Sequence, residues 1–481
     1  MAADACVSGG FAKTVAGQDG VGRGDLSDAP AGAGDIVAYV ADLARAAKEA
    51  SRPLGFASDE ARQAAVRAMA SSLRDRAADV LAANALDMKA ARAAGTDAGK
   101  LDRLLLTPER VEAMAAGLEA VASLPDPVGR VLEHRTIDCG LDLTKVSVPL
   151  GLVAMVYEAR PNVTSDAAGI CVRTGNACIL RGGSLAERSC VAIARALADA
   201  VEASGFPRAA VSIIDSPDRA ATAALMRLRG TVDLLIPRGG AGLIQRCVRE
   251  SLVPVIETGT GNCHVYVHAA ADLARARAIV MNAKTQRVGV CNAAESLLVD
   301  RSIADAFLPG MLRELADAGV LVHGDDVARA AAEAAGLVCA PREMSADEVR
   351  AARATAVPGE VVPQFVDATE DDWGREYLAL EMSVKAVEGE DEAIAHINRY
   401  GTGHSEAIVT EDVQAGERFL REVDAAAVYV NASTRFTDGG EFGLGAEIGI
   451  STQKLHARGP FAAEALTTYK YEIRGTGQVR P

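Results

Sequence analysis

Short apolar runs alternate with longer amphipathic stretches along most of this chain. The runs are typical of buried strands, and the stretches between them, with apolar residues every three or four positions, are typical of helices. Strands separated by helices indicate βαβ units, which build a largely parallel sheet. We therefore predict an α/β protein. The predicted strands are residues 152–157, 177–180, 211–214, 234–236, 254–256, 264–267, 296–299, 320–322, 361–365, 382–387, 407–409 and 427–430.

Two other sequence patterns lie outside this alternating region. Residues 35–122 have a helical pattern, with a helix start at Ser58 and an Ala-rich helical stretch at 64–86. Residues 131–147 alternate apolar and polar side chains around Cys139-Gly140, which predicts an exposed hairpin, and residues 467–473 predict one more edge strand. The first 34 residues, rich in Gly, Ala and Asp, are expected to form a flexible tail. Two α/β domains follow, joined near residues 256–261.

Composition excludes several classes of protein. The 481 residues carry 50 basic and 65 acidic side chains, a net charge of −15, so sequence-independent binding to nucleic acid is not expected. The nine cysteines are odd in number and form no C-x-x-C pair, which favours a reducing compartment and argues against a zinc site. His264 and His268 lack a third ligand nearby, so we expect no metal. No stretch approaches the roughly 18 apolar residues of a membrane span. No secretory signal is visible either, so a cytoplasmic location is expected.

Cys291 is the leading candidate for a catalytic nucleophile. Gly289 lets a ligand approach the backbone, and Arg287 and Asn292 make the neighbourhood polar. Such a setting lowers the pKa of a thiol, whereas apolar burial raises it. The competing interpretation is a cysteine that only fills space, because free cysteines are among the most buried residues.

Two glycine-rich turns are candidates for binding phosphate groups. Each follows a predicted strand, opens a helix and pairs an arginine with glycines, which suits a phosphate ester at the carboxyl end of a parallel strand. No Walker A or G-x-G-x-x-G motif is present. The alternative is that these glycines only make turns. The two turns are Arg181-Gly182-Gly183-Ser184 and Arg238-Gly239-Gly240.

Two further polar residues follow predicted strands. Asn162, in the turn after residues 152–157, is either a helix cap or a side-chain donor to an oxyanion near Cys291. Glu257, among the glycines of Thr258-Gly259-Thr260-Gly261, is either a general base or a loop anion.

Together, several segments closely resemble the γ-glutamyl phosphate reductases, a branch of the aldehyde dehydrogenase superfamily. The resemblance covers residues 35–473 in order, and residues 1–34 have no match. It rests on residues 148–184, Glu257 to His264, Gln286-Arg287 with Cys291-Asn292, Tyr400 to Glu406, and Phe442 to Ile450.

The resemblance implies an aldehyde-dehydrogenase-like fold with two three-layer αβα domains, mainly parallel sheets and a β-hairpin oligomerisation flap. It implies a cofactor-binding domain of residues 35–130, 149–256 and 431–463, a catalytic domain of 257–430, and a flap of 131–148 with 464–481. A homodimer or homotetramer would form through the flap, because an alternating edge strand needs a partner.

The resemblance also implies roles for residues. Cys291 would be the catalytic cysteine and Asn162 the oxyanion donor. Arg181 would reach the adenosine ribose, and Ser184 stands where many NAD-preferring relatives have a glutamate, which favours NADP. Glu376 would contact the nicotinamide ribose. Cations for the substrate carboxylate and phosphate would come from Arg160, Arg287, Arg435 or Arg458, and Glu257 would hold substrate or cofactor rather than activate water.

The implied reaction is the NADPH-dependent reduction of L-glutamyl 5-phosphate to L-glutamate 5-semialdehyde through a Cys291 thioester, the second step of proline biosynthesis from glutamate. The nearest alternative is a hydrolytic or coenzyme-A-acylating aldehyde dehydrogenase, which Glu257 would favour. A third alternative is an inactive relative that serves as an assembly partner, for example of glutamate 5-kinase. The resemblance also implies contact of an active enzyme with that kinase, because the product of the kinase is labile.

Overall fold

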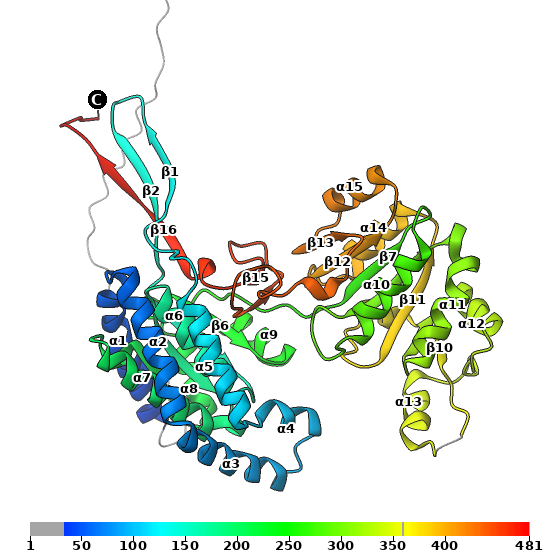
Figure 1. Ribbon diagram of the computed structural model, residues 1–481, viewed down its shortest axis with the longest axis horizontal. Coiled ribbons are helices and arrows are strands. Elements are labelled where there is room, and N and C mark those ends of the chain that lie inside the picture. Colours follow the sequence, from blue (N-terminus) through cyan, green and yellow to red (C-terminus); the bar gives the residue numbers. More distant parts are fainter. Residues whose placement is uncertain (1–32, 358–359, 481) are drawn as a thin grey trace, which may run out of the picture.

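The computed structural model describes residues 33–357 and 360–480, which form two α/β domains and a projecting antiparallel ribbon (Figure 1). Helix α1 (Ala33–Gly55) begins two residues before the expected Asp35, and the rest of the expected tail lies outside the described residues. Among the described residues, no helix combines the length and apolar character needed to cross a membrane.

The first domain is built on a four-stranded parallel sheet with the order β5-β4-β3-β6. Because crossovers between parallel strands are right-handed, the steps β3–β4–β5 place α6 and α7 on one face, and the reversed step to β6 places α8 on the other. The contacts of α6 with α7, and of α1 with α8, agree with this arrangement. The elements are β3 (Leu152–Tyr157), α6 (Asn162–Arg173), β4 (Ala177–Gly182), α7 (Glu187–Ala203), β5 (Val211–Ile213), α8 (Arg219–Met226), β6 (Leu234–Arg238) and α9 (Ala241–Glu250).

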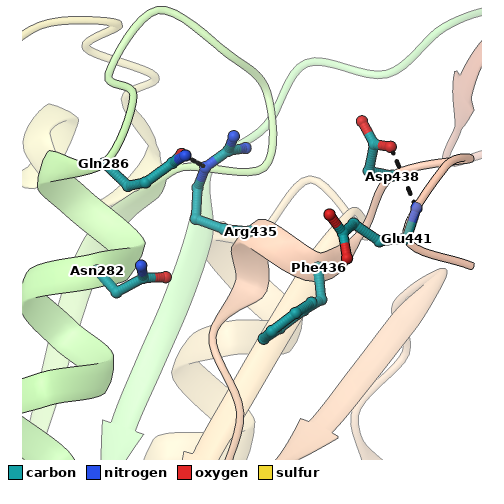
Figure 2. A pocket seen from close by; sticks show the side chains of 6 residues that line it. All are labelled: Asn282, Gln286, Arg435, Phe436, Asp438 and Glu441. Atoms are coloured by element: carbon teal, nitrogen blue, oxygen red, sulfur yellow. Dashed lines mark hydrogen bonds between the residues drawn. The ribbon is translucent and has the colours of Figure 1, made fainter.

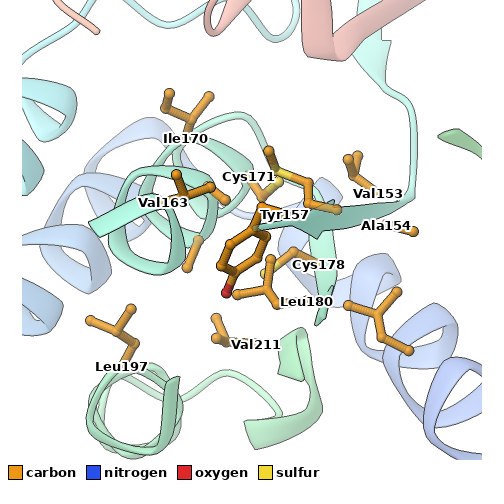
Figure 3. Packing of buried hydrophobic residues seen from close by; sticks show 14 of the residues in the cluster. Val153, Ala154, Tyr157, Val163, Ile170, Cys171, Cys178, Leu180, Leu197 and Val211 are labelled. Carbon is orange, nitrogen blue, oxygen red and sulfur yellow. The ribbon is translucent and has the colours of Figure 1, made fainter. Parts of the chain in front are cut away.

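An N-terminal helical layer packs on α6 and α7, the helices that cover one face of this sheet. Ser58 begins α2 as predicted, because its hydroxyl accepts a hydrogen bond from the Ala61 amide at 3.3 Å. Apolar side chains from β3, β4 and α6 meet in one buried core (Figure 3), with Tyr157 and Thr164 hydrogen-bonded through their hydroxyls inside it. The helices are α2 (Asp59–Asp75), α3 (Ala77–Ala93), α4 (Ala98–Leu104) and α5 (Pro108–Ala122).

The second domain contains a seven-stranded parallel sheet with the order β10-β9-β11-β8-β7-β12-β13. Its strands are β7 (Cys263–Val267), β8 (Ala294–Asp300), β9 (Leu321–Gly324), β10 (Phe365–Asp367), β11 (Glu381–Val387), β12 (Ser405–Val409) and β13 (Ala427–Val430). Its helices are α10 (Leu273–Thr285), α11 (Ala304–Asp317), α12 (Asp326–Ala334), α13 (Ala346–Thr355), α14 (Glu390–Tyr400) and α15 (Val413–Glu422).

Strand alternation divides the second domain into three layers. In β7, Val265 and Val267 join the core beneath α10 and α11, whereas Tyr266 joins a separate core beneath α14 and α15. In β8, Leu297 likewise joins the first of these cores and Leu298 the second. Neighbouring residues on a strand point to opposite faces, so helices cover both faces of this sheet. The predicted αβα architecture with mainly parallel sheets is therefore present.

The predicted hairpin forms the projecting ribbon (Figure 1). Strands β1 (Val131–Thr136), β2 (Asp142–Pro149) and β16 (Thr467–Arg474) pair antiparallel, with β2 in the centre. Near the C-terminus β14 (Gly449–Ser451) pairs with β15 (Gly459–Phe461), and Ile448 and Phe461 pack into the core of the first domain.

Two local predictions of strands were wrong. Residues 254–256 form only an isolated bridge with Leu235, whose amide donates to the Pro254 carbonyl and whose carbonyl accepts from the Ile256 amide. A run of three residues that includes a proline is too short, and lacks one N–H donor, to continue the hydrogen bonding of a sheet. Strand β10 begins at Phe365, so only the last residue of the predicted strand 361–365 is extended in the sheet. The predicted helical stretch 64–86 is helical, and it is divided at Arg76 between α2 and α3.

Candidate active site

Cys291 lies half-buried in the turn between α10 and β8. The Ala293 amide donates to the Val290 carbonyl at 3.2 Å and closes that turn. Cys291 therefore precedes its strand, and Gly261 likewise precedes β7, the parallel neighbour of β8. The nucleophile stands at the amino ends of the second sheet, whereas the predicted phosphate turns follow the strands of the first sheet.

The backbone around Cys291 is tightly constrained. A β-carbon on Gly261 would lie 1.5 Å from the Cys291 carbonyl oxygen, and the Cys263 thiol donates to that oxygen at 3.2 Å. The Gly261 amide donates to a carboxylate oxygen of Glu376 at 2.7 Å. Gly261 thus joins Cys291 to Glu376, two residues that lie 85 positions apart in the numbering (376 − 291).

The charge around Cys291 differs from the expectation. The pKa of the Cys291 thiol is raised to about 11, chiefly by burial and also by the nearby carboxylates of Glu447 and Glu376. The guanidinium of Arg238 is the cation that opposes this rise. The prediction that a polar neighbourhood lowers this pKa was wrong: Arg287 is exposed, and Asn292 is buried with its amide donating to the Thr437 carbonyl at 2.8 Å.

Four arginines share the region around Cys291. Burial lowers the pKa of Arg160, and the charges of Arg238 and Arg287 lower it too, whereas a Cys291 thiolate would raise it. Burial and the charge of Arg287 also lower the pKa of Arg435, opposed by Asp438 and Cys291. Arginines that lower one another's pKa in this way form a positively charged region, which is suited to binding an anion.

Asn162 is the first residue of α6, and Pro161 occupies the capping position, so the alternative of a helix cap is excluded. The Asn162 side-chain amide donates to a carboxylate oxygen of Asp166 at 3.1 Å. Burial raises the pKa of Asp166 to about 6, and Arg238 opposes this shift. An amide has two N–H donors, so one remains for a ligand.

The first glycine-rich turn joins β4 to a 3₁₀ turn, Ser184–Ala186. A β-carbon on Gly182 would stand 2.8 Å from the sulfur of Cys190, so packing alone requires that glycine. Arg181 is buried and donates to the Pro217 carbonyl at 3.1 Å, while its Nε has no partner among the described residues. Ser184 is exposed at the end of the turn.

The second turn is covered by a side chain that sequence analysis did not single out. The Gly240 amide donates to a carboxylate oxygen of Glu158 at 2.9 Å, and a β-carbon on Gly239 would stand 2.8 Å from that carboxyl group. Glu158 follows β3, the neighbour of β6, which places its carboxylate at the N-terminus of α9. The predicted phosphate position therefore already contacts an anion, and no signal in the sequence pointed to this contact.

The remaining predicted residues lie elsewhere. The Glu257 amide donates to Gln453 at 2.7 Å, and Glu257 lines a cavity with Val253 and Leu455, among others, but not with Cys291. Arg458 donates to Asp424 at 2.7 Å, so a carboxylate already engages its guanidinium.

The histidines of β7 have separate partners: His264 pairs with Glu406 at 3.0 Å and His268 with Thr410 at 2.8 Å. Within residues 33–357 and 360–480, no group of three or more His, Cys, Asp or Glu side chains is arranged to hold a metal ion.

Known proteins match this chain along nearly its whole length. The aldehyde dehydrogenase family matches residues 35–332 and 375–449. The γ-glutamyl phosphate reductase of Clostridium beijerinckii is 50% identical over 434 residues, covering 90% of this chain and 98% of the relative. That of Thermobifida fusca is 48% identical over 446 residues, covering 93% and 100%.

Solved structures agree with these matches. The crystal structure of the γ-glutamyl phosphate reductase of Thermotoga maritima superposes with a TM-score of 0.83 at 42% identity, covering 93% of this chain and 100% of that chain. An acetylating aldehyde dehydrogenase of Geobacillus thermoglucosidasius, 20% identical with a TM-score of 0.63, shares the fold.

Proposed function

The chain belongs to the aldehyde dehydrogenase family, and we propose that it acts there as a γ-glutamyl phosphate reductase. It is an oxidoreductase that uses a nicotinamide cofactor, converting L-glutamyl 5-phosphate to L-glutamate 5-semialdehyde and phosphate. This reaction is the second step of proline biosynthesis from glutamate. The observation that carries the proposal is the placement of Cys291 among Arg160, Arg238, Arg287 and Arg435.

This placement suits attack on an acyl phosphate. The cations favour binding of the anionic substrate, and Arg238 in particular favours the thiolate of Cys291. When the sulfur attacks the acyl carbon, charge develops on the acyl oxygen, where the Asn162 amide and the Cys291 backbone N–H are the proposed donors. The carbon–oxygen bond to phosphate then breaks, and the electron pair leaves with the phosphate.

The residues at the carboxyl ends of β4 and β6 fit a dinucleotide. Arg181 presents a buried Nε without a partner among the described residues, and the α9 N-terminus already attracts the carboxylate of Glu158. Glu376 is the proposed ligand of the nicotinamide ribose. The bound cofactor would supply the hydride that reduces the thioester, and Cys291 would leave as the resulting thiohemiacetal collapses to the aldehyde.

NADPH is the proposed reductant. Ser184 lacks the carboxylate that would repel a 2′-phosphate, and Arg181 lies three residues away with its positive charge. Gly182, Gly183, Gly239 and Gly240 are the proposed backbone contacts of the cofactor phosphates.

Assembly and location are also proposals. Strands β1 and β16 are both edge strands, and they expose Val131, Leu132, Tyr471 and Ile473, which suits a homodimer or homotetramer. We also propose a cytoplasmic enzyme that receives its labile substrate from glutamate 5-kinase.

The reverse reaction tests this function. Purified enzyme receives glutamate 5-semialdehyde, NADP and either phosphate or arsenate, and NADPH formation is followed. We expect activity that requires the oxyanion, is lost in Cys291→Ala and persists in Cys139→Ala, whose thiol is exposed in the ribbon. Activity without phosphate would instead indicate a hydrolytic aldehyde dehydrogenase, and dependence on coenzyme A an acylating one. No activity under any condition would indicate an inactive assembly partner.

A further inference from the structure

A cavity of mixed charge lies beside the nucleophile turn, between the end of α10 and the segment that follows β13 (Figure 2). Asn282 and Gln286 are one helical turn apart and present their amides from the same side. The opposite side comes from a 3₁₀ turn, Thr434–Phe436, and the residues after it. The lining residues are Asn282, Gln286, Arg435, Phe436, Asp438 and Glu441.

Hydrogen bonds fasten this cavity to the nucleophile turn. Asn292, the residue after Cys291, donates through its side-chain amide to the carbonyls of Arg435 at 3.3 Å and Thr437 at 2.8 Å. In return, the hydroxyl of Thr434 donates to the Asn292 carbonyl at 2.8 Å. A ligand held in the cavity is therefore held at a fixed position relative to the backbone of the nucleophile turn.

The guanidinium of Arg435 is available to bind an anion. Its Nε donates to the Gln286 side chain at 2.9 Å, and no carboxylate of the described residues lies within ion-pair distance of its terminal nitrogens (Figure 2). Partial burial without such a partner leaves a charge that a bound carboxylate would stabilise through two parallel hydrogen bonds.

The same cavity carries two carboxylates. One oxygen of Asp438 accepts from the Gly440 amide at 2.8 Å, which fixes the carboxylate and leaves its second oxygen for a ligand. The carboxylate of Glu441 lies beside Phe436 and has no hydrogen-bond partner among the described side chains (Figure 2). Two acidic groups beside one guanidinium suit a ligand with both a negative and a positive charge.

A phosphate group fits this cavity poorly. Its two negative charges would stand beside the carboxylates of Asp438 and Glu441, and like charges repel one another. Arg160 and Arg238, which border Cys291 without belonging to this cavity, are the better partners for phosphate. An α-amino acid head group has the required pair of charges on one carbon.

We propose that this cavity binds the α-carboxylate of the substrate through Arg435 and its α-ammonium through Asp438 and Glu441. The methylenes of the substrate then extend past Phe436, and the phosphorylated end reaches Cys291. This assignment rests on the proposed function, and it makes the cavity the part of the enzyme that selects an amino-acid aldehyde over a simple one.

Four aldehydes test the contributions of the α-carboxylate and the α-ammonium separately. Glutamate semialdehyde carries both, glutarate semialdehyde lacks the ammonium, 4-aminobutanal lacks the carboxylate, and butanal lacks both. For each variant, kcat/KM with NADP and phosphate is divided by the wild-type value on the same aldehyde. Arg435→Gln should lower this ratio about 10- to 100-fold on the two aldehydes with a carboxylate and spare the other two. Glu441→Gln and Asp438→Asn should act on the two aldehydes with an ammonium.

Controls make the result decisive. Arg421→Gln removes an exposed cation of α15 and should leave all four ratios near one. If butanal is turned over too slowly, inhibition constants of norvaline, pentanoate and butylamine give the same comparison without chemistry. Equal losses on all substrates, or no loss, would overturn the assignment. A wild-type enzyme without phosphate-dependent activity on glutamate semialdehyde would instead overturn the proposed function.

Discussion

The α-carbon of Gly261 lies directly against the backbone carbonyl of Cys291, where any β-carbon would stand 1.5 Å from the carbonyl oxygen. Gly261 also donates its amide to Glu376 at 2.7 Å. Gly261, which precedes β7, therefore holds the nucleophile turn in place from one side. Glu376, in a loop of the same domain, in turn holds Gly261 in place.

Gly261→Ala should abolish activity, because the backbone of the nucleophile turn must move to admit the methyl group. We expect a loss of at least about 100-fold in kcat and a loss of stability of about 1–3 kcal/mol, as for an overpacked core. The matched control is Gly117→Ala in α5, where the added carbon would meet no atom within 4 Å apart from the adjoining backbone of its own helix. That change should leave activity intact and stabilise the helix by roughly 0.5–1 kcal/mol. Activity assays and urea unfolding measure both effects, and a fully active Gly261→Ala enzyme would contradict the packing.

The Cys291 thiol should alkylate slowly in the free enzyme. Since burial raises its pKa to about 11, the thiolate fraction and the iodoacetamide rate should climb about tenfold per pH unit from pH 7 upwards, without a plateau near neutrality. Removing the charge of Arg238 (Arg238→Gln) removes the cation that lowers this pKa, so alkylation at pH 8 should become slower. Glu447→Gln should make it faster. Shifts of the same sign in both variants would be inconsistent with these electrostatics, and labelled Cys291 is identified by mass spectrometry.

Lys284 and Glu295 form an ion pair at 2.5 Å in which both side chains are fully buried. Glu295 also accepts from the Leu378 amide at 3.1 Å, which supports a non-glycine residue with a φ of 54°. Glu295→Gln should cost about 3–5 kcal/mol of unfolding free energy, because it leaves a buried charge without its partner. The double variant Lys284→Met/Glu295→Leu should lose less than either single change. Additive losses in chemical denaturation would show that the two charges are independent.

Glu158 should weaken cofactor binding, because its carboxylate contacts the α9 N-terminus where a phosphate group is proposed to bind. Glu158→Gln removes the charge and should tighten NADP binding about two- to fivefold at low salt, with a smaller gain at high salt. Fluorescence titration at two ionic strengths measures this. Glu250→Gln, at the other end of α9, is the control and should leave the affinity unchanged. Unchanged or weaker binding by Glu158→Gln would count against competition at this turn.

Ser184 should set the preference for NADP. Ser184→Glu places a carboxylate beside the proposed 2′-phosphate and should reduce the NADP-to-NAD ratio of kcat/KM at least about tenfold. Ser184→Gln, similar in size and uncharged, separates charge from volume. A wild-type enzyme that used NAD better than NADP would show that Ser184 and Arg181 do not determine the choice.

Much of the fold was predictable from local pattern. The run 152–157 became β3 with the same bounds, and Ser58 begins α2 by accepting from Ala61, because period and capping depend on residues close in sequence. Residues 254–256 and 361–365 were misjudged because a short apolar run does not reveal whether a neighbouring strand is available to pair with it. The apolar content of a segment does not show whether a partner strand lies beside it in the fold.

By itself, the sequence determined the alternation of strands and helices, the family and Cys291 as the nucleophile candidate, because these depend on spacing and residue type along the chain. Only the tertiary structure decided the charges around that nucleophile. It brought Arg238 and Glu447 to Cys291 and placed Glu158 on Gly240. A pKa or an ion pair depends on burial and on groups within a few ångströms. Residues separated by tens or hundreds of positions satisfy those conditions only after the chain has folded.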